Sequence, residues 1–385
     1  MATDNNNKVL NVPNLRFPEF TEVWKDSNIG KCFDLYSGNT PSRMEKKHFI
    51  GDVNWITSGE LKEHYIGDTK ERISEKAAED NNLRILPVGT FVMAIYGLEA
   101  EGVRGTCSIT VKTSTISQAC MAFTPKSNVS NEFLYSWYKK HGNKIGIRYA
   151  QGTKQQNLSY DIIEKFPIRY PSIEEQEKLN TFISLLDKRI ATQNKIIEKL
   201  ESLIKGIYDK TFANFSKYLA LSSICKIQKG QQVNGEELSD FGEYYVMNGG
   251  IEPSGYYDKY NTMPNTISIS EGGNSCGYIQ FNTVPFWSGG HCYTLQGIST
   301  EYNTHFVYHY LKSKEKEIMA LRIGSGLPNI QKKDLEKYLI PVLSLETQKS
   351  IVNGINKIET KLKHEKDILS AYQTQKAYLL RNLFI

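Results

Sequence analysis

Residues 173–212 carry apolar side chains at alternating steps of four and three, which is the heptad spacing of a coiled-coil seam. The pattern predicts one long amphipathic helix, with Ser172 as its N-cap and Glu175 completing a capping box. The expected seam positions are Leu179, Ile183, Leu186, Ile190, Gln193, Ile197, Leu200 and Ile204. Periodicity alone also allows an ordinary surface helix packed on its own domain. The same pattern, however, occurs a second time in the chain.

The second copy belongs to an internal duplication. At a shift of 172 residues the halves align without a gap, and the matched pairs include Gly152 with Gly324, Asn157 with Asn329, Ser172 with Ser344 and Gln193 with Glu365. The second helix is expected to pair through Ile351, Ile355, Ile358, Leu362, Glu365 and Leu369. Because a lone amphipathic helix cannot bury its stripe, the two copies are expected to pair with each other.

Each long helix follows a stretch that is expected to form a globular domain of short strands and short helices. Runs typical of β-strands, separated by Gly-, Asn- and Ser-rich turns, lie at 52–57, 90–96, 107–111, 219–229, 244–248, 266–270 and 277–281. Short helices are expected at 133–141 and 306–312. The sequence therefore predicts an α+β fold with an internal two-fold repeat, in which two mixed, mainly β domains are separated by two long helices that pair as an antiparallel coiled coil. The expected segments are a disordered tail at 1–14, a first domain at 15–172, a first helix at 173–216, a second domain at 217–344 and a second helix at 345–385.

Composition limits the class of protein. The 385 residues carry a net charge of +5, which is weak support for a polyanionic partner. The six cysteines are scattered without a close pair, which argues against a zinc ribbon or a redox CxxC motif. The chain opens without a signal-peptide pattern, and its longest apolar stretch, 85–96, is too short to cross a bilayer. We therefore expect a reduced, cytoplasmic protein that does not contact membranes.

Motifs for catalysis are missing from the sequence. It contains no P-loop, GxGxxG, HExxH or GxSxG pattern, no glycine-rich adenosylmethionine loop and no Asn-Pro-Pro-aromatic segment of DNA amino-methyltransferases. Gly324-Ser325-Gly326 superficially resembles a nucleophile turn, but a loop role is the stronger interpretation. His291 and Cys292 are adjacent, and two neighbouring ligands do not make a metal site. We predict neither a catalytic residue nor a metal site.

The loops carry the candidate binding residues. Arg, Lys, Gln, Asn and Ser side chains can hydrogen-bond to base edges and phosphates, and neighbouring glycines let the backbone approach closely. In the first half the candidates are Ser37, Asn39, Thr40, Arg43, Ser58, Arg104, Thr153, Lys154 and Gln155. In the second half they are Lys229, Gln231, Asn248, Asn274, His291, Arg322 and Ser325. The alternative is that such stretches are simply turns. The halves differ most in these loops, as expected of two domains that read different sequences.

The predicted helix pair suggests a target of matching geometry. At ~1.5 Å per residue, roughly 36 residues form a rod about 50 Å long. An antiparallel pair would place one globular domain at each end of this rod. Duplex DNA is extended, periodic and two-fold symmetric, so it suits such a molecule, although protein scaffolds also use rods.

Several motifs together resemble the specificity (S) subunit of type I restriction–modification systems along essentially the whole chain. They are residues 15–20 (LRFPEF) with Trp24, residues 37–42 (SGNTPS) with 51–56 (GDVNWI), and residues 156–159 (QNLS) with 166–168 (FPI) and 171–176 (PSIEEQ). The second junction, 327–331 with Thr347 in the place of Glu175, departs from the pattern.

The resemblance implies two target-recognition domains, each reading one half of a split DNA sequence. The helices would set the spacer and dock two modification (methyltransferase) subunits, with Phe182 and Ile196 as candidate contacts, and two restriction (translocase/nuclease) subunits could join them. The complex would direct adenine methylation and restriction of double-stranded DNA. Adenosylmethionine, ATP and magnesium are expected on the partner subunits, and this chain is expected to bind no cofactor.

Two other functions fit parts of the sequence. A self-contained DNA methyltransferase would bind adenosylmethionine, and the missing motifs speak against it. A coiled-coil scaffold for proteins alone would show no affinity for duplex DNA even with partner subunits present.

Overall fold

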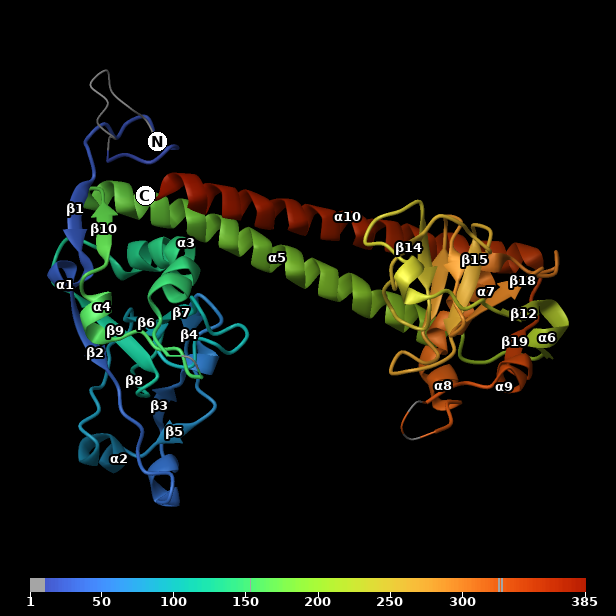
Figure 1. Ribbon diagram of the computed structural model, residues 1–385, viewed down its shortest axis with the longest axis horizontal. Helices are drawn as coiled ribbons and strands as arrows, with labels where there is room; N and C mark the ends of the chain where they lie inside the picture. The colour runs from blue at the N-terminus through green and yellow to red at the C-terminus, as the bar shows by residue number, and fades with distance from the viewer. Residues whose placement is uncertain (1–10, 153, 325, 327) are drawn as a thin grey trace. The chain divides into compact units, whose positions relative to one another are not determined.

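The computed structural model describes residues 11–152, 154–324, 326 and 328–385, which form two units (Figure 1). The first unit contains the described residues up to Thr192 together with Leu369–Ile385, and the second contains Gln193–Ile368. Both long helices, α5 (Ile173–Thr211) and α10 (Leu345–Leu383), therefore contribute one part to each unit.

The first unit is built around a five-stranded sheet in the order β2-β9-β6-β7-β4. Its strands are β2 (Phe33–Ser37), β9 (Cys120–Pro125), β6 (Phe91–Ala94), β7 (Cys107–Thr110) and β4 (Tyr65–Ile66). A smaller sheet, β5-β3-β8, consists of β5 (Arg72–Ile73), β3 (Val53–Ile56) and β8 (Ser114–Ile116). The ribbon pair is β1 (Lys25–Asn28) with β10 (Pro167–Tyr170). The helical elements are α1 (Ile29–Cys32), η1 (Lys46–Phe49), η2 (Ser58–Glu60), α2 (Glu75–Asp80), α3 (Asn131–Tyr149) and α4 (Tyr160–Ile163).

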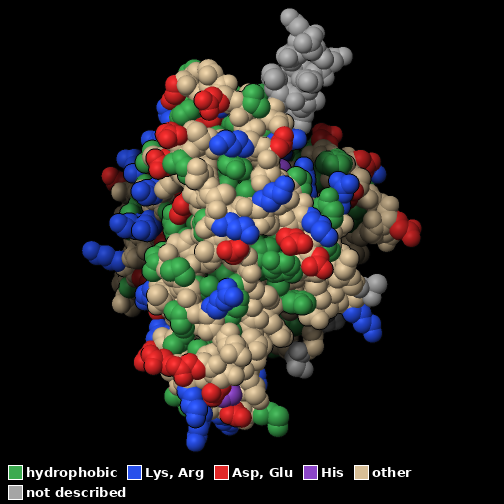
Figure 2. Space-filling model, turned by 90° about the vertical axis from the view of Figure 1, so that its left-hand side faces the viewer, with side chains coloured by type: hydrophobic (Ala, Val, Ile, Leu, Met, Phe, Trp, Pro, Cys, Tyr) green, Lys and Arg blue, Asp and Glu red, His purple; other side chains and the backbone are tan. Residues whose placement is uncertain are grey.

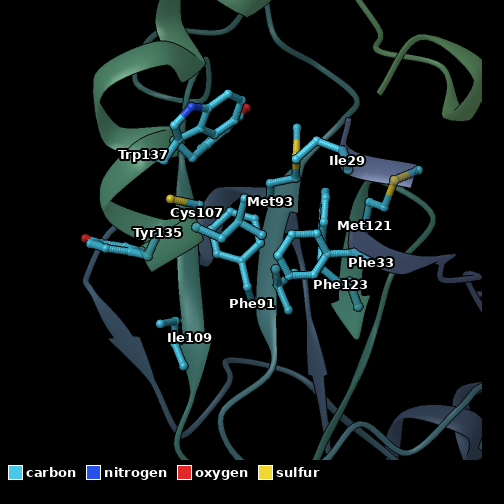
Figure 3. Close-up of a cluster of buried hydrophobic side chains, with 14 of the residues drawn as sticks. Ile29, Phe33, Phe91, Met93, Cys107, Ile109, Met121, Phe123, Tyr135 and Trp137 are labelled. Carbon is cyan, nitrogen blue, oxygen red and sulfur yellow. The ribbon is translucent and has the colours of Figure 1, made fainter. Parts of the chain in front are cut away.

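Aromatic side chains form the centre of this first core. Phe91 is fully buried, and its ring meets that of Phe123 edge-on at 5.1 Å. Figure 3 shows these side chains gathered with Phe33 and with Trp137 of α3. Phe384, directly after α10, packs against Phe133 with ring centroids 5.4 Å apart and so belongs to the core of the first unit.

The second unit repeats this plan. Its main sheet has the order β12-β18-β15-β16, which matches β2-β9-β6-β7 strand for strand. The strands are β12 (Lys226–Lys229), β18 (Cys292–Gln296), β15 (Thr266–Ser270) and β16 (Ile279–Asn282). The remaining strands are β11 (Tyr218–Ala220), β13 (Tyr244–Met247), β14 (Tyr256–Tyr257), β17 (Trp287–Ser288) and β19 (Leu339–Pro341). The helices are α6 (Leu221–Ile224), η3 (Gly235–Glu237), α7 (Thr304–Ser313), α8 (Glu315–Ala320) and α9 (Lys332–Glu336). The predicted α+β repeat is therefore confirmed.

Some predicted boundaries were wrong. Residues 219–229 do not form one strand, because α6 separates β11 from β12. The first short helix is longer than predicted, since α3 runs from Asn131 to Tyr149. Helix α5 ends at Thr211, and Phe212 turns into the second core, where its ring meets Tyr310 at 5.6 Å.

The predicted tail at 1–14 was also too long. Residues 1–10 lie outside the described part, but 11–14 contact the first unit. The carbonyl of Asn11 accepts the Trp24 N–H at 2.9 Å, and Pro13 is buried.

The parts of α5 and α10 lie side by side and run in opposite directions within each unit (Figure 1). In the first unit Asp187 pairs with Lys376, and the Arg189 guanidinium lies 5.5 Å from the Tyr372 ring. In the second unit the Gln193 Nε2 donates to the Glu365 carbonyl at 3.1 Å and to its carboxylate. All fourteen predicted seam residues are buried or half-buried.

Glu175 does not complete the capping box expected at the start of α5. Its backbone N–H donates to the Ser172 Oγ at 3.4 Å, which is the ordinary cap. Its carboxylate turns instead to Arg16, with bonds of 2.8 and 2.7 Å, and accepts from the Trp24 Nε1 at 3.3 Å. A bidentate guanidinium pair is stronger than a neutral backbone cap, which explains the difference.

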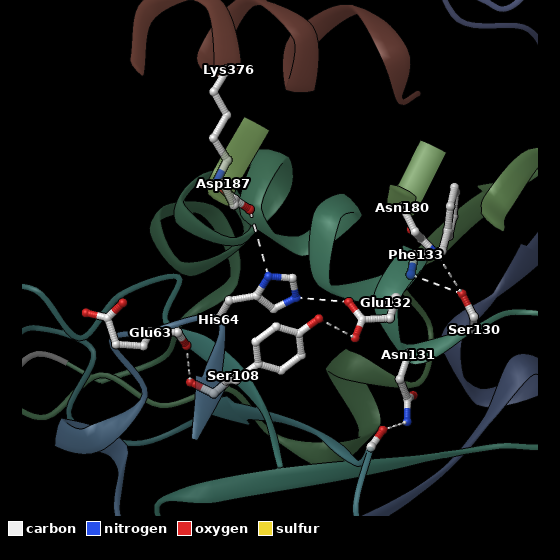
Figure 4. A network of polar contacts seen from close by, with 12 residues as sticks. Glu63, His64, Ser108, Ser130, Asn131, Glu132, Phe133, Asn180, Asp187 and Lys376 are labelled. Carbon is white, nitrogen blue, oxygen red and sulfur yellow. Dashed lines mark hydrogen bonds and ion pairs between the residues drawn. The ribbon is translucent and has the colours of Figure 1, made fainter. Parts of the chain in front are cut away.

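A histidine joins the globular part to the helices in each unit. In the first, His64 stacks on Tyr135. The His64 Nε2 lies 2.9 Å from the Glu132 carboxylate, and its Nδ1 lies 3.8 Å from that of Asp187 (Figure 4). In the second, His309 bonds to the Tyr208 hydroxyl at 2.9 Å and to the Asn356 Oδ1 at 3.0 Å. Burial lowers the pKa of His309 from 6.5 to about 4.

We predict that Glu175→Ala destabilises the first unit by about 3 kcal/mol, because it leaves the largely buried Arg16 guanidinium unpaired. The control is Glu174→Ala in the same turn, whose side chain is exposed, and we expect it to cost much less than Glu175→Ala. Urea denaturation followed by tryptophan fluorescence measures this, since Trp24, Trp55 and Trp137 all lie in the first unit. Equal losses for the two variants would contradict the assignment.

We also predict that acid destabilises the second unit through His309. Between pH 6.5 and about 4 the unfolded chain binds a proton at this residue and the folded unit does not. The contribution to stability is therefore complete above pH 6.5 and falls by about 3 kcal/mol as the pH approaches 4. Thermal melts over this range should show a flatter dependence for His309→Gln than for His364→Gln, a control at an exposed position of α10. The same slope in both variants would refute the prediction.

Candidate nucleic-acid interface

Three of the predicted binding residues meet in one cleft of the second unit. Lys229 at the end of β12, Asn248 after β13 and His291 before β18 line a cavity of about 610 Å³. The other lining residues include four glycines, Gly249, Gly250, Gly272 and Gly273. Such glycine-rich walls leave room for a ligand to approach the backbone.

A buried carboxylate organises this cleft. Glu271 is only 9% exposed, and its Oε1 accepts from the Lys229 Nζ at 2.6 Å and from the Tyr293 hydroxyl at 2.9 Å. Its Oε2 makes no hydrogen bond among the described residues and lies 3.5 Å from the His291 Nδ1. The Asn248 Oδ1 holds the His291 backbone N–H at 3.0 Å. Burial, followed by the Glu271 carboxylate, raises the pKa of Tyr293 far above its usual range, so its hydroxyl stays protonated.

Glu271 and Tyr293 were not among the residues predicted from the sequence. The available signal was the position of Glu271, directly after the fully buried strand β15 and directly before two glycines. Tyr293 lies inside a buried strand and looks like an ordinary core residue. Its role follows only from the register of β12 against β18, which pairs it with Lys229.

One glycine is needed for the cleft to form. A Cβ on Gly230 would lie 2.2 Å from the Gly289 carbonyl oxygen and 2.4 Å from that of Ser288. The chain after Lys229 can therefore approach the loop after β17 only without a side chain at this position.

The first unit places its candidates in two separate groups. Around the loop at 37–43, Arg43 forms a bidentate pair with Glu71 at 2.6 and 2.7 Å, and its guanidinium lies 4.7 Å from the Phe49 ring. The Arg43 guanidinium lowers the pKa of Glu71. Asn39 accepts from the Trp55 Nε1 at 3.1 Å through its carbonyl. Both residues thus help to hold the loop on the smaller sheet.

Arg104 belongs to the second group. Its guanidinium donates to the Gln156 Oε1 at 2.6 Å, and its stem covers Gly146 of α3, where a Cβ would lie 2.5 Å from the Arg104 Cγ. Arg104 thus holds Gln156, which closely follows the exposed Lys154 and Gln155.

The remaining candidates do not converge. Thr153 and Ser325 lie outside the described residues. The other six are exposed or half-buried and do not line the cleft of the second unit; they are Ser37, Thr40, Ser58, Gln231, Asn274 and Arg322.

Equivalent positions of the two units carry different side chains. Strand register pairs Lys229 with Tyr293 in the second unit, and Ser37 with Met121 in the first. Ile330 N–H donates to the Glu271 carbonyl at 2.9 Å, just as Leu158 N–H donates to the Ile95 carbonyl at 2.9 Å. His291 and Ala119 likewise accept the N–H of Glu271 and of Ile95. The polar set Lys229, Glu271, His291 and Tyr293 therefore corresponds to Ser37, Ile95, Ala119 and Met121.

The surface and the side-chain chemistry add four observations. On the face drawn in Figure 2, Lys and Arg side chains are interspersed with Asp and Glu. In the described part of the chain, no three His, Cys, Asp or Glu side chains come together as metal ligands. Cys292 is buried beside Met247 and Phe286 while His291 faces the cleft, so the two neighbours point apart. None of the described helices is both long and apolar enough to span a membrane.

Known proteins resemble the chain over nearly its whole length. The family model described as "Type I restriction modification DNA specificity domain" matches residues 21–202 and 216–371. The MjaIX type I restriction enzyme specificity subunit of Methanocaldococcus jannaschii is 25% identical over 417 residues, which cover 96% of this chain and 94% of that protein.

Solved structures share the fold. An S subunit of a type I restriction–modification system from M. genitalium matches with a TM-score of 0.67 at 20% identity, covering 97% of this chain and 99% of that one. A chain from a structural study of type I R-M complex assembly matches with a TM-score of 0.60 at 15% identity, covering 93% and 96%. The resemblance found in the sequence motifs is thereby confirmed, and the chain belongs to the family of type I restriction–modification specificity subunits.

Proposed function

We propose that each globular domain, 15–172 and 217–344, reads one half of a bipartite double-stranded DNA site. The observation that carries this proposal is the shared sheet with unlike side chains. The two units repeat the same strand order and the same backbone hydrogen bonds. Yet Glu271, His291 and Tyr293 of the second unit have apolar counterparts in the first, and the charged Lys229 corresponds to the neutral Ser37. A common sheet with different side chains is expected of two domains that contact the same DNA phosphate backbone but read different base sequences.

In this proposal the helices set the spacer between the half-sites and dock two modification (methyltransferase) subunits. Apolar side chains that stay exposed beside the buried seam support docking. Phe182 and Leu185 are 38% and 59% exposed, and Leu203 is 49% exposed. Ile196, the other predicted contact, is half-buried.

The chemistry would then belong to the partners. The chain would itself be non-catalytic and would direct adenine methylation by the modification subunits and cleavage by two restriction (translocase/nuclease) subunits. Adenosylmethionine, ATP and magnesium would bind to those subunits. A complex of this kind acts on cellular and incoming DNA, and we place it in the cytoplasm.

Domain exchange tests the division of labour. We expect replacement of residues 15–172 by the equivalent segment of another family member to change one half of the methylated motif and leave the other unchanged. A second chimera should also exchange 379–385, because the end of α10 packs in the first core. Methylation mapping in cells that carry the chain with its modification subunits gives the motif. A change in both halves would disprove independent reading.

Helix insertion tests the spacer. One heptad added after Gln193, together with one added after Glu365, preserves the phase of both seams and lengthens each helix by about 10 Å. We expect both half-sites to stay the same while the spacer grows by up to about three base pairs. A four-residue insertion in α5 alone is the mismatched control and should abolish assembly. An altered half-site in the matched variant would argue against the proposal.

A further inference from the structure

The polar cluster of the second unit is not required by the fold. At the equivalent positions of the first unit, Ile95 and Met121 are 3% and 1% exposed, and the same backbone hydrogen bonds are made. The same sheet therefore forms without a charged side chain at any of these positions. Burying a carboxylate costs free energy unless it is paired, and replacing a buried pair by apolar residues is often neutral or stabilising. A charged pair kept at such a place indicates a role other than stability.

We propose that Lys229, oriented by Glu271 and Tyr293, reads a guanine in the half-site of the second unit. This inference rests on the proposed function and assigns one residue of the reading to it. The Lys229 side chain is 52% exposed, whereas the Glu271 side chain is 12% exposed. Lys229 is therefore the group that can reach DNA, and Glu271 is a positioning residue.

The number of donors fits a base edge. A lysine ammonium has three N–H bonds, and Glu271 takes one of them at 2.6 Å. Two remain to donate, and guanine presents two acceptors, N7 and O6, side by side in the major groove. Tyr293 holds the same carboxylate oxygen at 2.9 Å, which keeps the carboxylate from following the lysine.

The charge of the cluster favours a base over a phosphate. Phosphate contacts draw their strength from net positive charge. The adjacent carboxylate cancels the charge of Lys229, so the pair offers hydrogen-bond donors with little net attraction for an anion. A neutral acceptor such as the guanine edge depends less on net charge, so its binding to Lys229 is weakened less by the neighbouring carboxylate. The glycines at 249, 250, 272 and 273 leave the space that a base edge needs.

The test transfers the side chains of the first unit. The variants are Lys229→Ser and the triple variant Lys229→Ser, Glu271→Ile, Tyr293→Met, whose set of residues already exists in a folded sheet of this chain. We expect both to lose the preference for guanine at one position of the second half-site by about tenfold, with the first half-site unchanged. Glu271→Gln keeps an acceptor for Lys229 and should retain most of the preference.

Lys226→Ser is the matched control, since Lys226 is exposed on the same strand, β12. We expect it to leave the motif as it is. The motif is mapped by methylation in cells with the modification subunits, and affinity is measured by competition among duplexes that differ at single positions.

A second measurement uses the unchanged protein. Duplexes with 7-deazaguanine, which lacks the N7 acceptor, should bind about tenfold more weakly when the substitution is at the position read by Lys229. No loss at any guanine of the second half-site would overturn the inference.

Three other results would also overturn it. One is a second half-site without a G·C pair. Another is an unchanged motif in both Lys229 variants. The third is uniform weakening for all sequences with a salt dependence reduced by about one unit, which would mark a phosphate contact. A wild-type complex whose motif has no two-part structure would instead refute the proposed function itself.

Discussion

Burial of the apolar stripes of α5 and α10 is the interaction on which both units depend. Leu179 and Ile183 of α5 belong to the core of the first unit, as do Leu383 of α10 and the following Phe384. Val352 and Ile355 of α10 belong to that of the second, with Ile207 packed against it. The first unit therefore combines two separate stretches of chain, the described residues up to Thr192 and Leu369–Ile385, whereas the second unit is the continuous stretch Gln193–Ile368. The end of the sequence is as necessary to the first unit as its beginning.

Polar contacts then select the arrangement that apolar burial leaves open. A stripe of Leu and Ile tolerates shifts by a heptad, whereas a hydrogen bond between Gln193 and Glu365 is satisfied in one register only. The counterparts Asp187 and Glu359 each lie near a histidine of the globular part, His64 and His309. Both copies therefore have a carboxylate at the same position of the long helix, Asp187 or Glu359. The histidine beside it comes from a different part of the globular domain in each copy.

At the candidate interface the two units share the backbone of the main sheet and differ in the side chains that it carries. The main sheets agree in strand order and in register, and this agreement makes a position-by-position comparison possible. The comparison distinguishes residues that the sheet requires in order to form, such as the glycine after β12, from residues that it does not require, such as Glu271. In the first unit the predicted arginines are already engaged, Arg43 by Glu71 and Arg104 by Gln156, so they stabilise loops that present other side chains.

The sequence by itself determined the duplication, the two long helices and the family. These features can be recognised from periodic spacing along the chain and from the constant shift between its two copies. Neither pattern requires knowing which residues contact one another. Only the tertiary structure decided that Glu175 pairs with Arg16 and not with its own helix end, that Phe212 leaves α5 for the second core, and that Glu271 meets Lys229 across 42 positions of sequence. Such contacts join distant segments, and their formation depends on strand order and register, which no local pattern specifies.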